Sequence, residues 1–310
     1  MDLINRSLPF YQADVFTDVA FGGNPVAVFP QAPDLSNAEF QQIAREMNLS
    51  ETVFVRPPTQ SDAHFKLRIF TPTHEIPFAG HPVIGTCYVL GMLKHLTMEA
   101  PITRVRYECN IGVFSAELYV LGGEIDRVEM SQPQPQFIEV VERVEDHFDI
   151  AQALGIKNTS ICSQQFPVEV VSTGLPVMIV PIRTLTAVKS IVPEHGAILD
   201  ICHRVGANGM MVFSTMTVED ASSVHTRMFA RPIGIDEDPA TGSASGALGA
   251  YLVKNGVVEV RPTTEIVAEQ GYEIERPSRI LIHVYSDDDM IQSVRVGGQV
   301  VMVAEGKMVY

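Results

Sequence analysis

The chain has 310 residues, more than one compact core usually needs, and this length favours two domains. Its apolar fraction of 46% and charged fraction of 19% are those of a globular protein and exclude extended disorder. The formal net charge of −15 argues against a protein that binds nucleic acid or an anionic membrane, because phosphate binding requires clustered Lys and Arg.

The start of the chain, Met1 to Arg6, has no basic segment followed by an apolar run. It therefore predicts no signal peptide and a cytoplasmic location. The most apolar stretch, Val168 to Ile182, contains Gly174 and Pro176 and predicts a strand, a turn and a second strand rather than a membrane span. We expect no membrane association.

Alternating apolar residues punctuated by Gly and Pro predict many short strands and few helices. The clearest strands are expected at His64 to Phe70 and Arg127 to Met130. In chain order, the expected helices are Asn37 to Met47 with Ser36 as N-cap, Val83 to Leu93, Val192 to Val205, and Ala244 to Lys254.

The order of these elements occurs twice. In the first half a strand from Glu51 is followed by a second strand, a Gly-containing loop and a helix, and in the second half the same order begins at Gly209. This duplication predicts two pseudo-symmetric domains. The join is expected at the proline-rich segment 132–136, which gives domains 1–132 and 133–310. The last strand, Val300 to Val303, is a candidate to cross back to the first domain.

The two Gly-containing loops each lead into a helix, whose start presents unpaired backbone N–H groups that suit a carboxylate. Gly80 and Gly242 allow a ligand to approach the backbone closely. Pro82 suits the first helical position, which places His81 at or near the cap with its ring towards a ligand. If the halves face each other, both helix starts line one cleft. The alternative is two ordinary glycine turns with local caps.

Three adjacent acids, Asp236, Glu237 and Asp238, precede the second loop, and such a cluster is unfavourable unless its members are solvated or partnered. A metal site is one interpretation. It is disfavoured because neighbours on an extended segment point in opposite directions, and His74 and His81 lack a usual ligand spacing. No metal is therefore expected.

A serine-hydrolase elbow is a second interpretation of this loop. The stretch from Gly242 to Gly246 has Ala244 at the position where that motif needs its serine. Ser243 is better interpreted as a hydrogen-bond donor to a substrate.

Four motifs together resemble a known family. They are Asn24-Pro25-Val26-Ala27-Val28, Asn48-Leu49-Ser50-Glu51-Thr52-Val53-Phe54, Phe78-Ala79-Gly80-His81-Pro82 and Glu237-Asp238-Pro239-Ala240-Thr241-Gly242-Ser243-Ala244. In type and order they are similar to the signatures of the phenazine-biosynthesis PhzF-like isomerases, over nearly the whole chain. The resemblance implies an α+β fold like that of diaminopimelate epimerase. Each half would be a mixed sheet wrapped around a central helix, with the active site between the halves, and the family implies a homodimer.

The resemblance also implies roles for individual residues. Glu51 matches the family's acid/base, and His81, Asp238 and Ser243 match its polar site residues. Gly80 and Gly242 match the glycines that supply backbone contacts to the substrate.

Related epimerases and racemases carry a pair of cysteines at the two loops. Here those places hold His81 and Ser243, and the nearest thiol, Cys87, lies six residues further along the helix. A two-thiol racemase mechanism is therefore not expected.

The family's best-known substrate is trans-2,3-dihydro-3-hydroxyanthranilate, whose proton is moved without a metal or cofactor. We accordingly expect a cofactor-independent isomerase that transfers a proton between carbons of a small cyclic or amino carboxylate, with Glu51 as general acid/base in the cleft. Two alternatives stay open: an epimerase of an amino-acid derivative, and a non-catalytic protein that binds small carboxylates. The substrate itself depends on variable loops such as Arg56 to Asp62 and Pro135 to Glu145.

Overall fold

The computed structural model describes residues 6–287 and 290–310. The chain divides into two compact units, of which unit 1 comprises Met1–Ser131 and Gly297–Tyr310, and unit 2 comprises Gln132–Val296. Most of the predicted start, Met1 to Arg6, lies outside the described residues. Among the described residues, no helix is long and apolar enough to cross a membrane.

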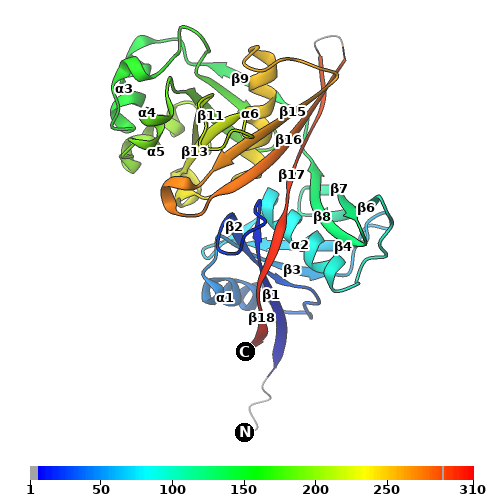
Figure 1. Ribbon diagram of the computed structural model, residues 1–310. Helices are drawn as coiled ribbons and strands as arrows, with labels where there is room; N and C mark the ends of the chain where they lie inside the picture. Colours follow the sequence, from blue (N-terminus) through cyan, green and yellow to red (C-terminus); the bar gives the residue numbers. More distant parts are fainter. Residues whose placement is uncertain (1–5, 288–289) are drawn as a thin grey trace. The chain divides into compact units, whose positions relative to one another are not determined.

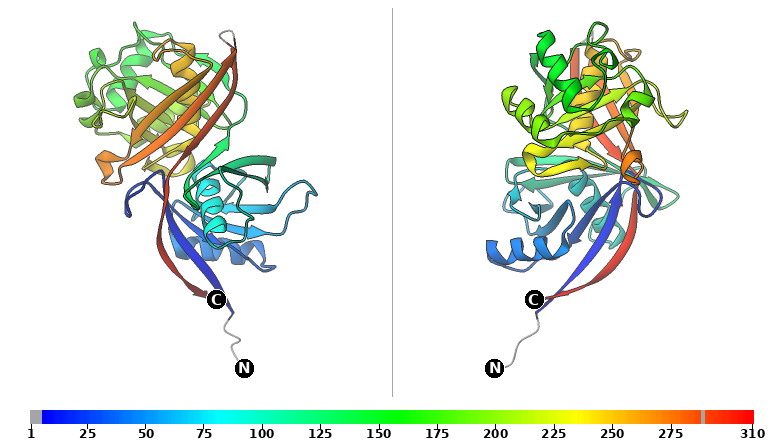
Figure 2. Two further views of the ribbon diagram at one scale, coloured as in Figure 1. Left: turned by 45° about the vertical axis from the view of Figure 1, so that its right-hand side comes forward. Right: turned by 90° about the vertical axis from the view of Figure 1, so that its left-hand side faces the viewer.

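Unit 1 is a mixed sheet with two helices (Figure 1). Its elements are β1 (Ser7–Val15), β2 (Asn24–Phe29), α1 (Asn37–Met47), β3 (Glu51–Arg56), β4 (Phe65–Phe70), β5 (Glu75–Ile76), α2 (Gly80–Met92), β6 (Ile102–Cys109), β7 (Gly112–Leu121), β8 (Glu124–Ser131) and β18 (Val300–Val309). The last strand, β18, pairs antiparallel with β1, and Figure 2 shows the two strands side by side, with the start of β1 next to the end of β18.

Helix α2 is the centre of unit 1, and the strands curve around it (Figure 1). It packs against β1, β2, β3, β7, β8 and β18. Eleven of its thirteen residues are buried, which is why its sequence is apolar on every side rather than along one stripe. Because the sheet encloses this helix, its N-terminal residues Gly80 and His81 are buried with it.

Unit 2 has more helices but the same plan. Its elements are β9 (Gln136–Val140), α3 (Val144–Ala153), η1 (Asn158–Ser160), β10 (Glu169–Ser172), β11 (Pro176–Pro181), α4 (Leu185–Lys189), α5 (His195–Arg204), β12 (Met210–Ser214), β13 (Val224–Ala230), η2 (Arg231–Ile233), β14 (Ile235–Asp238), α6 (Gly242–Lys254), β15 (Thr263–Gln270), η3 (Tyr272–Ile274) and β16 (Ser278–Asp287). Strand β17 (Met290–Gly298) begins in unit 2 and ends in unit 1. Helix α6 is buried much as α2 is, and it packs against β10, β11, β15 and β16.

The strand pairings of the two units repeat one another. In unit 1 the ladder runs β1, β2, β3, β4, β6, β7, with pairings that are antiparallel, parallel, antiparallel, parallel and antiparallel. In unit 2 the ladder β10, β11, β12, β13, β15, β16 has the same sequence of pairings. In each unit the thirteen-residue central helix connects the fourth strand of the ladder to the fifth through a short edge strand.

The predicted helix Asn37 to Met47 is confirmed, including Ser36 as N-cap in a capping box with Glu39. The predicted strand-turn-strand within Val168 to Ile182 is also confirmed, as β10 and β11. Two helix starts were predicted too late, since α2 begins at Gly80 and α6 at Gly242.

The predicted helix Val192 to Val205 is shorter than expected. It begins at His195 because the side chain of Glu194 caps it, accepting hydrogen bonds from the N–H groups of Gly196 and Ala197. The interpretation of Pro135 to Glu145 as a loop was wrong, because this segment forms β9 and the beginning of α3.

Candidate functional site

Glu51 and His81 meet inside unit 1. Glu51 is the first residue of β3, where it lies opposite Val26 of β2, and His81 is the second residue of α2. The Oε2 atom of Glu51 lies 3.1 Å from Nε2 of His81. Glu51 is 7% exposed and His81 6% exposed, so the two side chains face each other in a largely dry environment. The sequence predicted both residues, and the structure brings them together.

One carboxylate oxygen of Glu51 has no hydrogen-bond partner among the described residues. Its Oε2 atom is buried, and the orientation of the His81 ring does not make their 3.1 Å approach a hydrogen bond. Buried polar atoms are normally paired, so such an exception deserves a functional explanation. Catalytic hydrogen bonds are often misaligned without substrate and tighten when it binds.

The local sequence explains why Glu51 is held there. Helix α1 ends at Asn48, which has left-handed backbone angles and donates its N–H to the carbonyl of Ala44. The chain reverses and enters β3 only three residues later. The backbone of Glu51 is therefore already held by the pairing of β3 with β2. A side chain on a strand is positioned more precisely than one on a loop.

The start of α2 supplies backbone donors beside this pair. Its N-cap is Ala79, which has no side-chain oxygen, and no side-chain hydrogen bond caps the helix. The cap is therefore one residue before Gly80, whereas the sequence predicted His81 at or near the cap and Pro82 at the first position. His81 and Pro82 are instead the second and third helical residues. The orphan N–H groups and the partial positive charge of the helix end suit a carboxylate.

In unit 2, Asp238 and Gly242 lie at the two ends of a short turn between β14 and α6. Asp238 is 6% exposed, and the hydroxyl of Thr241 donates to its Oδ2. Gly242 is the first and Ser243 the second residue of α6, whose cap Thr241 makes no side-chain hydrogen bond to the helix. The carbonyl of Ser243 accepts a hydrogen bond from Thr173 at 3.0 Å.

The three adjacent acids do not act as a cluster. Asp236 pairs with Arg231 at 2.5 Å, Glu237 receives two hydrogen bonds from Arg227, and Asp238 is held by Thr241. Separate partners remove the repulsion that the sequence suggested. Among the described residues, no group of three or more His, Cys, Asp or Glu side chains is arranged to hold a metal ion.

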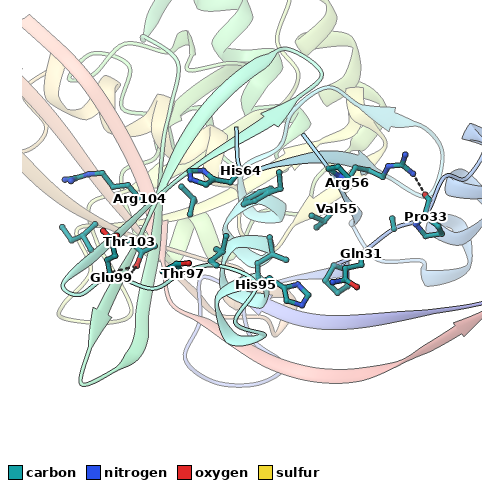
Figure 3. Close-up of a pocket in the computed structure, with 18 residues that line it drawn as sticks. Gln31, Pro33, Val55, Arg56, His64, His95, Thr97, Glu99, Thr103 and Arg104 are labelled. Carbon is teal, nitrogen blue, oxygen red and sulfur yellow. Dashed lines mark hydrogen bonds between the residues drawn. The ribbon is translucent and has the colours of Figure 1, made fainter. Parts of the chain in front are cut away.

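A cavity of about 900 Å³ in unit 1 does not include Glu51 or His81 (Figure 3). It lies beyond the C-terminal end of α2 and is lined by Leu90, His95, Arg56 and Arg104 among others. Both arginines are already engaged, Arg56 with Asp34 at 2.8 Å and Arg104 with Glu117 at 3.0 Å. The two arginine side chains of this cavity therefore already have carboxylate partners.

Sequence reasoning missed Gln270, which contacts the turn between β14 and α6. Its side-chain nitrogen donates to the carbonyl of Asp238 at 2.6 Å, and its side-chain oxygen accepts from the N–H of Thr241 at 3.2 Å. The sequence signal was available, since Gln270 ends a strand just before the glycine turn that follows the second helix. Nothing local, however, links it to residues some thirty positions earlier.

The sequence and the structure of the chain were compared with those of known proteins. The family model for phenazine biosynthesis-like proteins matches residues 13–306. The trans-2,3-dihydro-3-hydroxyanthranilate isomerase of Pseudomonas chlororaphis is 35% identical over 297 residues, covering 96% of this chain and 97% of the relative. A PhzF-family phenazine biosynthesis protein of Bacillus anthracis has a TM-score of 0.88 at 26% identity, covering 98% of this chain and 100% of the other.

A hydroxyproline epimerase from Agrobacterium vitis, solved with bound trans-4-hydroxy-L-proline, matches with a TM-score of 0.69. The identity is 12%, and the match covers 98% of this chain and 91% of the other, so this likeness concerns the fold alone. Together the matches confirm the α+β class, the epimerase-like architecture and the family resemblance predicted from the sequence.

Proposed function

We propose that this chain, which belongs to the phenazine biosynthesis-like (PhzF) family and is an isomerase, moves a proton between two carbons of a small carboxylate, with Glu51 as acid and base. The observation that carries the proposal is the buried approach of Glu51 to His81 at the uncapped start of α2. A single carboxyl that takes a proton and returns it needs neither a metal nor an organic cofactor.

The chemistry follows from that geometry. The Glu51 carboxylate takes a proton from one carbon of the substrate, and the electron pair left behind is delocalised through the conjugated double bonds. The protonated Glu51 then returns the proton to another carbon, so the carboxylate is regenerated and no oxidant or reductant is needed. A positioned acid/base group of this kind contributes about 10² to 10⁴ in rate.

The remaining predicted residues bind and orient the substrate in this proposal. Gly80 contributes backbone N–H donors at the start of α2, and Gly242 and Ser243 do so at the start of α6. His81 and Asp238 orient the amino or hydroxyl group of the substrate. Both helix starts lack a side-chain cap, and this shared property supports a binding role over that of an ordinary glycine turn.

As the first substrate to test, we propose trans-2,3-dihydro-3-hydroxyanthranilate, which the Pseudomonas chlororaphis relative is named for. The test is to incubate the protein with this compound in D₂O and to follow carbon-bound deuterium and double-bond position by NMR. We expect movement of the double bond, with deuterium at the carbon that receives the proton in every turnover in which the proton on Glu51 exchanges with solvent before it is returned. The variant Glu51→Gln should abolish both changes, whereas Glu46→Gln, at an exposed position on α1, should leave them intact.

Other outcomes of the same experiment separate the alternatives. Deuterium uptake with loss of optical rotation but no double-bond movement would identify an epimerase. Binding of the compound with neither deuterium uptake nor movement of the double bond would identify a carboxylate-binding protein and would refute the proposed catalysis.

We further propose that the enzyme acts in the cytoplasm as a homodimer, as the family resemblance implies. Light scattering coupled to size-exclusion chromatography tests the dimer, and a mass near the 34.1 kDa of one chain would refute it. Cell fractionation tests the location.

A further inference from the structure

One side chain, that of Gln270, holds the turn between β14 and α6 by hydrogen bonds, and it is 0% exposed. Its Nε2 donates to the carbonyl of Asp238 at 2.6 Å and to Oγ1 of Thr241 at 3.2 Å, and its Oε1 accepts from the N–H of Thr241 at 3.2 Å. The orientation of the amide is fixed, because the carbonyl can only accept and the backbone N–H can only donate. One side chain therefore holds both ends of the turn.

The hydroxyl of Thr241 does not cap α6, although Thr241 is the N-cap residue of that helix. Threonine at an N-cap normally accepts a hydrogen bond from the second or third N–H of its helix. Thr241 has the extended backbone of a cap, yet its hydroxyl receives the Gln270 proton, donates its own to Asp238 and makes no hydrogen bond to α6. The chain of donors runs from Gln270 through Thr241 to the Asp238 carboxylate.

The two central helices, α2 and α6, both begin without a side-chain cap, but for different reasons. At α2 the cap is Ala79, which has no oxygen to offer, whereas at α6 the cap is a threonine whose oxygen is turned away. A helix start without a side-chain cap is less stable than a capped one. Two independent arrangements with the same outcome indicate that the uncapped start is the feature that matters.

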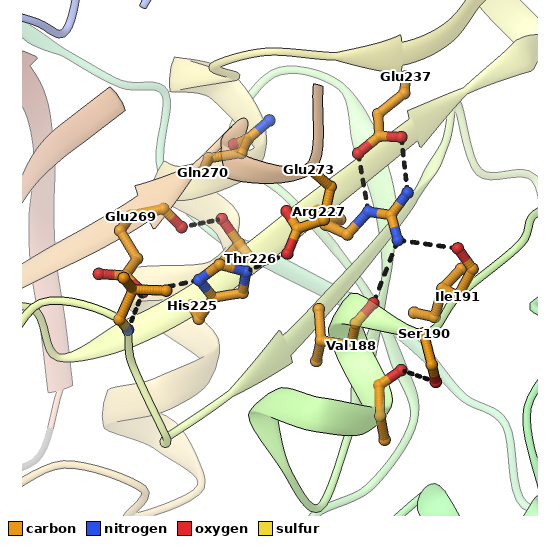
Figure 4. Close-up of polar contacts among 12 residues, drawn as sticks. Val188, Ser190, Ile191, His225, Thr226, Arg227, Glu237, Glu269, Gln270 and Glu273 are labelled. Atoms are coloured by element: carbon orange, nitrogen blue, oxygen red, sulfur yellow. Dashed lines mark hydrogen bonds and ion pairs between the residues drawn. The ribbon is translucent and has the colours of Figure 1, made fainter. Parts of the chain in front are cut away.

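The strand end that carries Gln270 is itself rigidly anchored (Figure 4). Its neighbour Glu269 points to the opposite side of β15, where it contacts Nδ1 of His225 at 2.7 Å, and the other ring nitrogen contacts Glu273 at 2.9 Å. Directly after Gln270, Gly271 has a φ of +82°, and a Cβ there would lie 2.6 Å from the carbonyl oxygen of Pro239. The backbone on both sides of Gln270 is therefore closely constrained, by the contacts of Glu269 on one side and by the tight packing of Gly271 on the other.

We propose that Gln270 is a positioning residue for substrate binding: by holding the Thr241 hydroxyl on Asp238, it keeps the first N–H groups of α6 available to the substrate carboxylate. This inference rests on the proposed function, in which the start of α6 binds that carboxylate. It makes a specific claim about what happens without Gln270. The released hydroxyl should cap the helix and compete with the ligand.

The first test needs no ligand. Hydrogen exchange of the amides of Ser243 and Ala244 is measured by NMR in the wild type, in Gln270→Met and in Gln270→Met/Thr241→Val. The freed hydroxyl should slow exchange about fivefold in Gln270→Met, since one cap contributes about that factor. Exchange should return to the wild-type rate in the double variant, which has no hydroxyl. Unslowed exchange in Gln270→Met, or slow exchange that persists in the double variant, would overturn the proposal.

The second test measures binding of 2-aminobenzoate by calorimetry in the same proteins. Gln270→Met should weaken binding about tenfold, Gln270→Met/Thr241→Val should recover part of the loss, and Gln42→Met, at an exposed position on α1, should bind normally. A purely structural Gln270 would give no recovery, because Thr241→Val would only add damage. Equal affinity of Gln270→Met and the wild type would refute the positioning role.

The two tests separate this inference from the proposed function. If the wild type fails to bind 2-aminobenzoate while amide exchange slows and recovers as expected, the substrate class is wrong and the control of the cap by Gln270 stands. Should Gln270→Met fail to fold, Gln270→Glu replaces it. A glutamate keeps the shape and accepts from Thr241 N–H, but when ionised it cannot donate to Asp238 or Thr241.

Discussion

The two units carry an ion pair with a buried carboxylate at the same place in the sheet, but with a different cation. In unit 1 the parallel ladder places Lys66 opposite Glu108, and the lysine Nζ lies 2.8 Å from the carboxylate. In unit 2 the matching ladder places His225 opposite Glu269, with Nδ1 at 2.7 Å. The pair is conserved between the halves of one molecule, although the residue that supplies the positive charge is not.

Each of these carboxylates also fastens the loop before the strand that carries the cation. Glu108 accepts hydrogen bonds from the backbone N–H groups of Thr59 and Gln60. Glu269 accepts from the backbone N–H groups of Val218 and Glu219. A neighbouring arginine pair is duplicated as well, since Arg68 binds Glu75 and Arg227 binds Glu237, each through two nitrogen atoms (Figure 4 shows the second).

The different cations give the two pairs different electrostatics. Burial opposes the charge on Glu108, yet hydrogen bonds from Lys66 and Thr59 outweigh it and bring the pKa of Glu108 to about 2. Burial likewise tends to lower the pKa of His225, but its two carboxylate partners, Glu269 and Glu273, outweigh burial and raise the pKa above its ordinary value of 6.5. The cation in unit 1 is a lysine, whereas the cation in unit 2 is a histidine with a raised pKa.

The duplication also shows where the halves diverge in function. Phe54 lies opposite Arg68 in unit 1, and Val212 lies opposite Arg227 in unit 2. Three residues before Phe54 is Glu51, whereas three residues before Val212 is Gly209. A Cβ at Gly209 would lie 2.4 Å from the side chain of Met228 and 2.8 Å from a carbonyl oxygen. Unit 2 therefore has no room for a second carboxylate at the matching place.

The largest effect that we predict concerns this asymmetry. Glu51→Gln should reduce single-turnover isomerisation about 10³-fold, because the amide keeps the size of the side chain but cannot accept the proton. The free energy of unfolding should change little, and calorimetric affinity for 2-aminobenzoate should stay near that of the wild type. Near-normal turnover would show that Glu51 is structural and that the proton carrier must be sought at His81 or Asp238.

The next effect tests the two ion pairs against each other by urea unfolding. His225→Ala should destabilise the protein by about 3 kcal/mol, because it leaves two buried carboxylates without their shared cation. Lys66→Ala should cost only about 1 kcal/mol, because the lysine side chain is 26% exposed and water can replace it. Equal losses in the two variants would contradict the distinction drawn here.

The third prediction is a pH dependence confined to unit 2. Since the folded pKa of His225 is raised, its contribution to stability is fully present below pH 6.5 and is lost as the pH rises through the folded pKa. The lowered pKa values of Glu269 and Glu273 affect only the acid range, where stability is lost as the pH falls through their folded values. Hydrogen exchange of segment 215–223 should therefore accelerate between pH 6 and 9, after correction for intrinsic exchange.

Segment 57–63 in unit 1 provides the internal control for this measurement. It is fastened by Glu108 with a lysine as cation, so its corrected exchange should stay constant over the same range. Lys66→His should transfer the pH dependence to this loop. A constant rate in segment 215–223 would rule out His225 as the titrating cation.

The smallest expected effect is that of thiol modification. Burial raises the pKa of Cys87 to about 12, and the side chain is 0% exposed, so little reactive thiolate forms. Helix α6 has Gly249 at the matching position, seven residues from its start, so Cys87 has no thiol counterpart in unit 2. Treatment of the native enzyme with iodoacetamide should leave the isomerisation rate unchanged. Rapid inactivation would place a reactive cysteine near the substrate.

The features that sequence predicted well are those encoded by neighbours along the chain. The helix from Asn37 to Met47 carries its own capping box, so its bounds follow from a few adjacent residues. Glu51 and His81 were both predicted as site residues from their motifs, but the 3.1 Å approach between them became visible only in the structure. Helix α4 was missed because its five residues, Leu185–Lys189, are too few for a periodic pattern.

What the sequence did not predict depends on contacts between distant segments. Lys66 and Glu108 are 42 positions apart, and His225 and Glu269 are 44 apart, so neither pair has a local signature. Each side chain alone is an ordinary polar residue on a strand, and only the parallel ladder reveals that the two oppose each other. The role of Gln270 was hidden for the same reason.

The discontinuity of unit 1 in the sequence has a consequence for how the chain is made. Residues 132–296 of unit 2 are contiguous and are synthesised before residues 297–310, which unit 1 needs for β18. Until then β1 has β2 on one side and an unpaired edge on the other, the kind of edge that invites pairing with another chain. Translation order therefore favours completion of unit 2 first, and the half that carries Glu51 closes only after β18 has been synthesised.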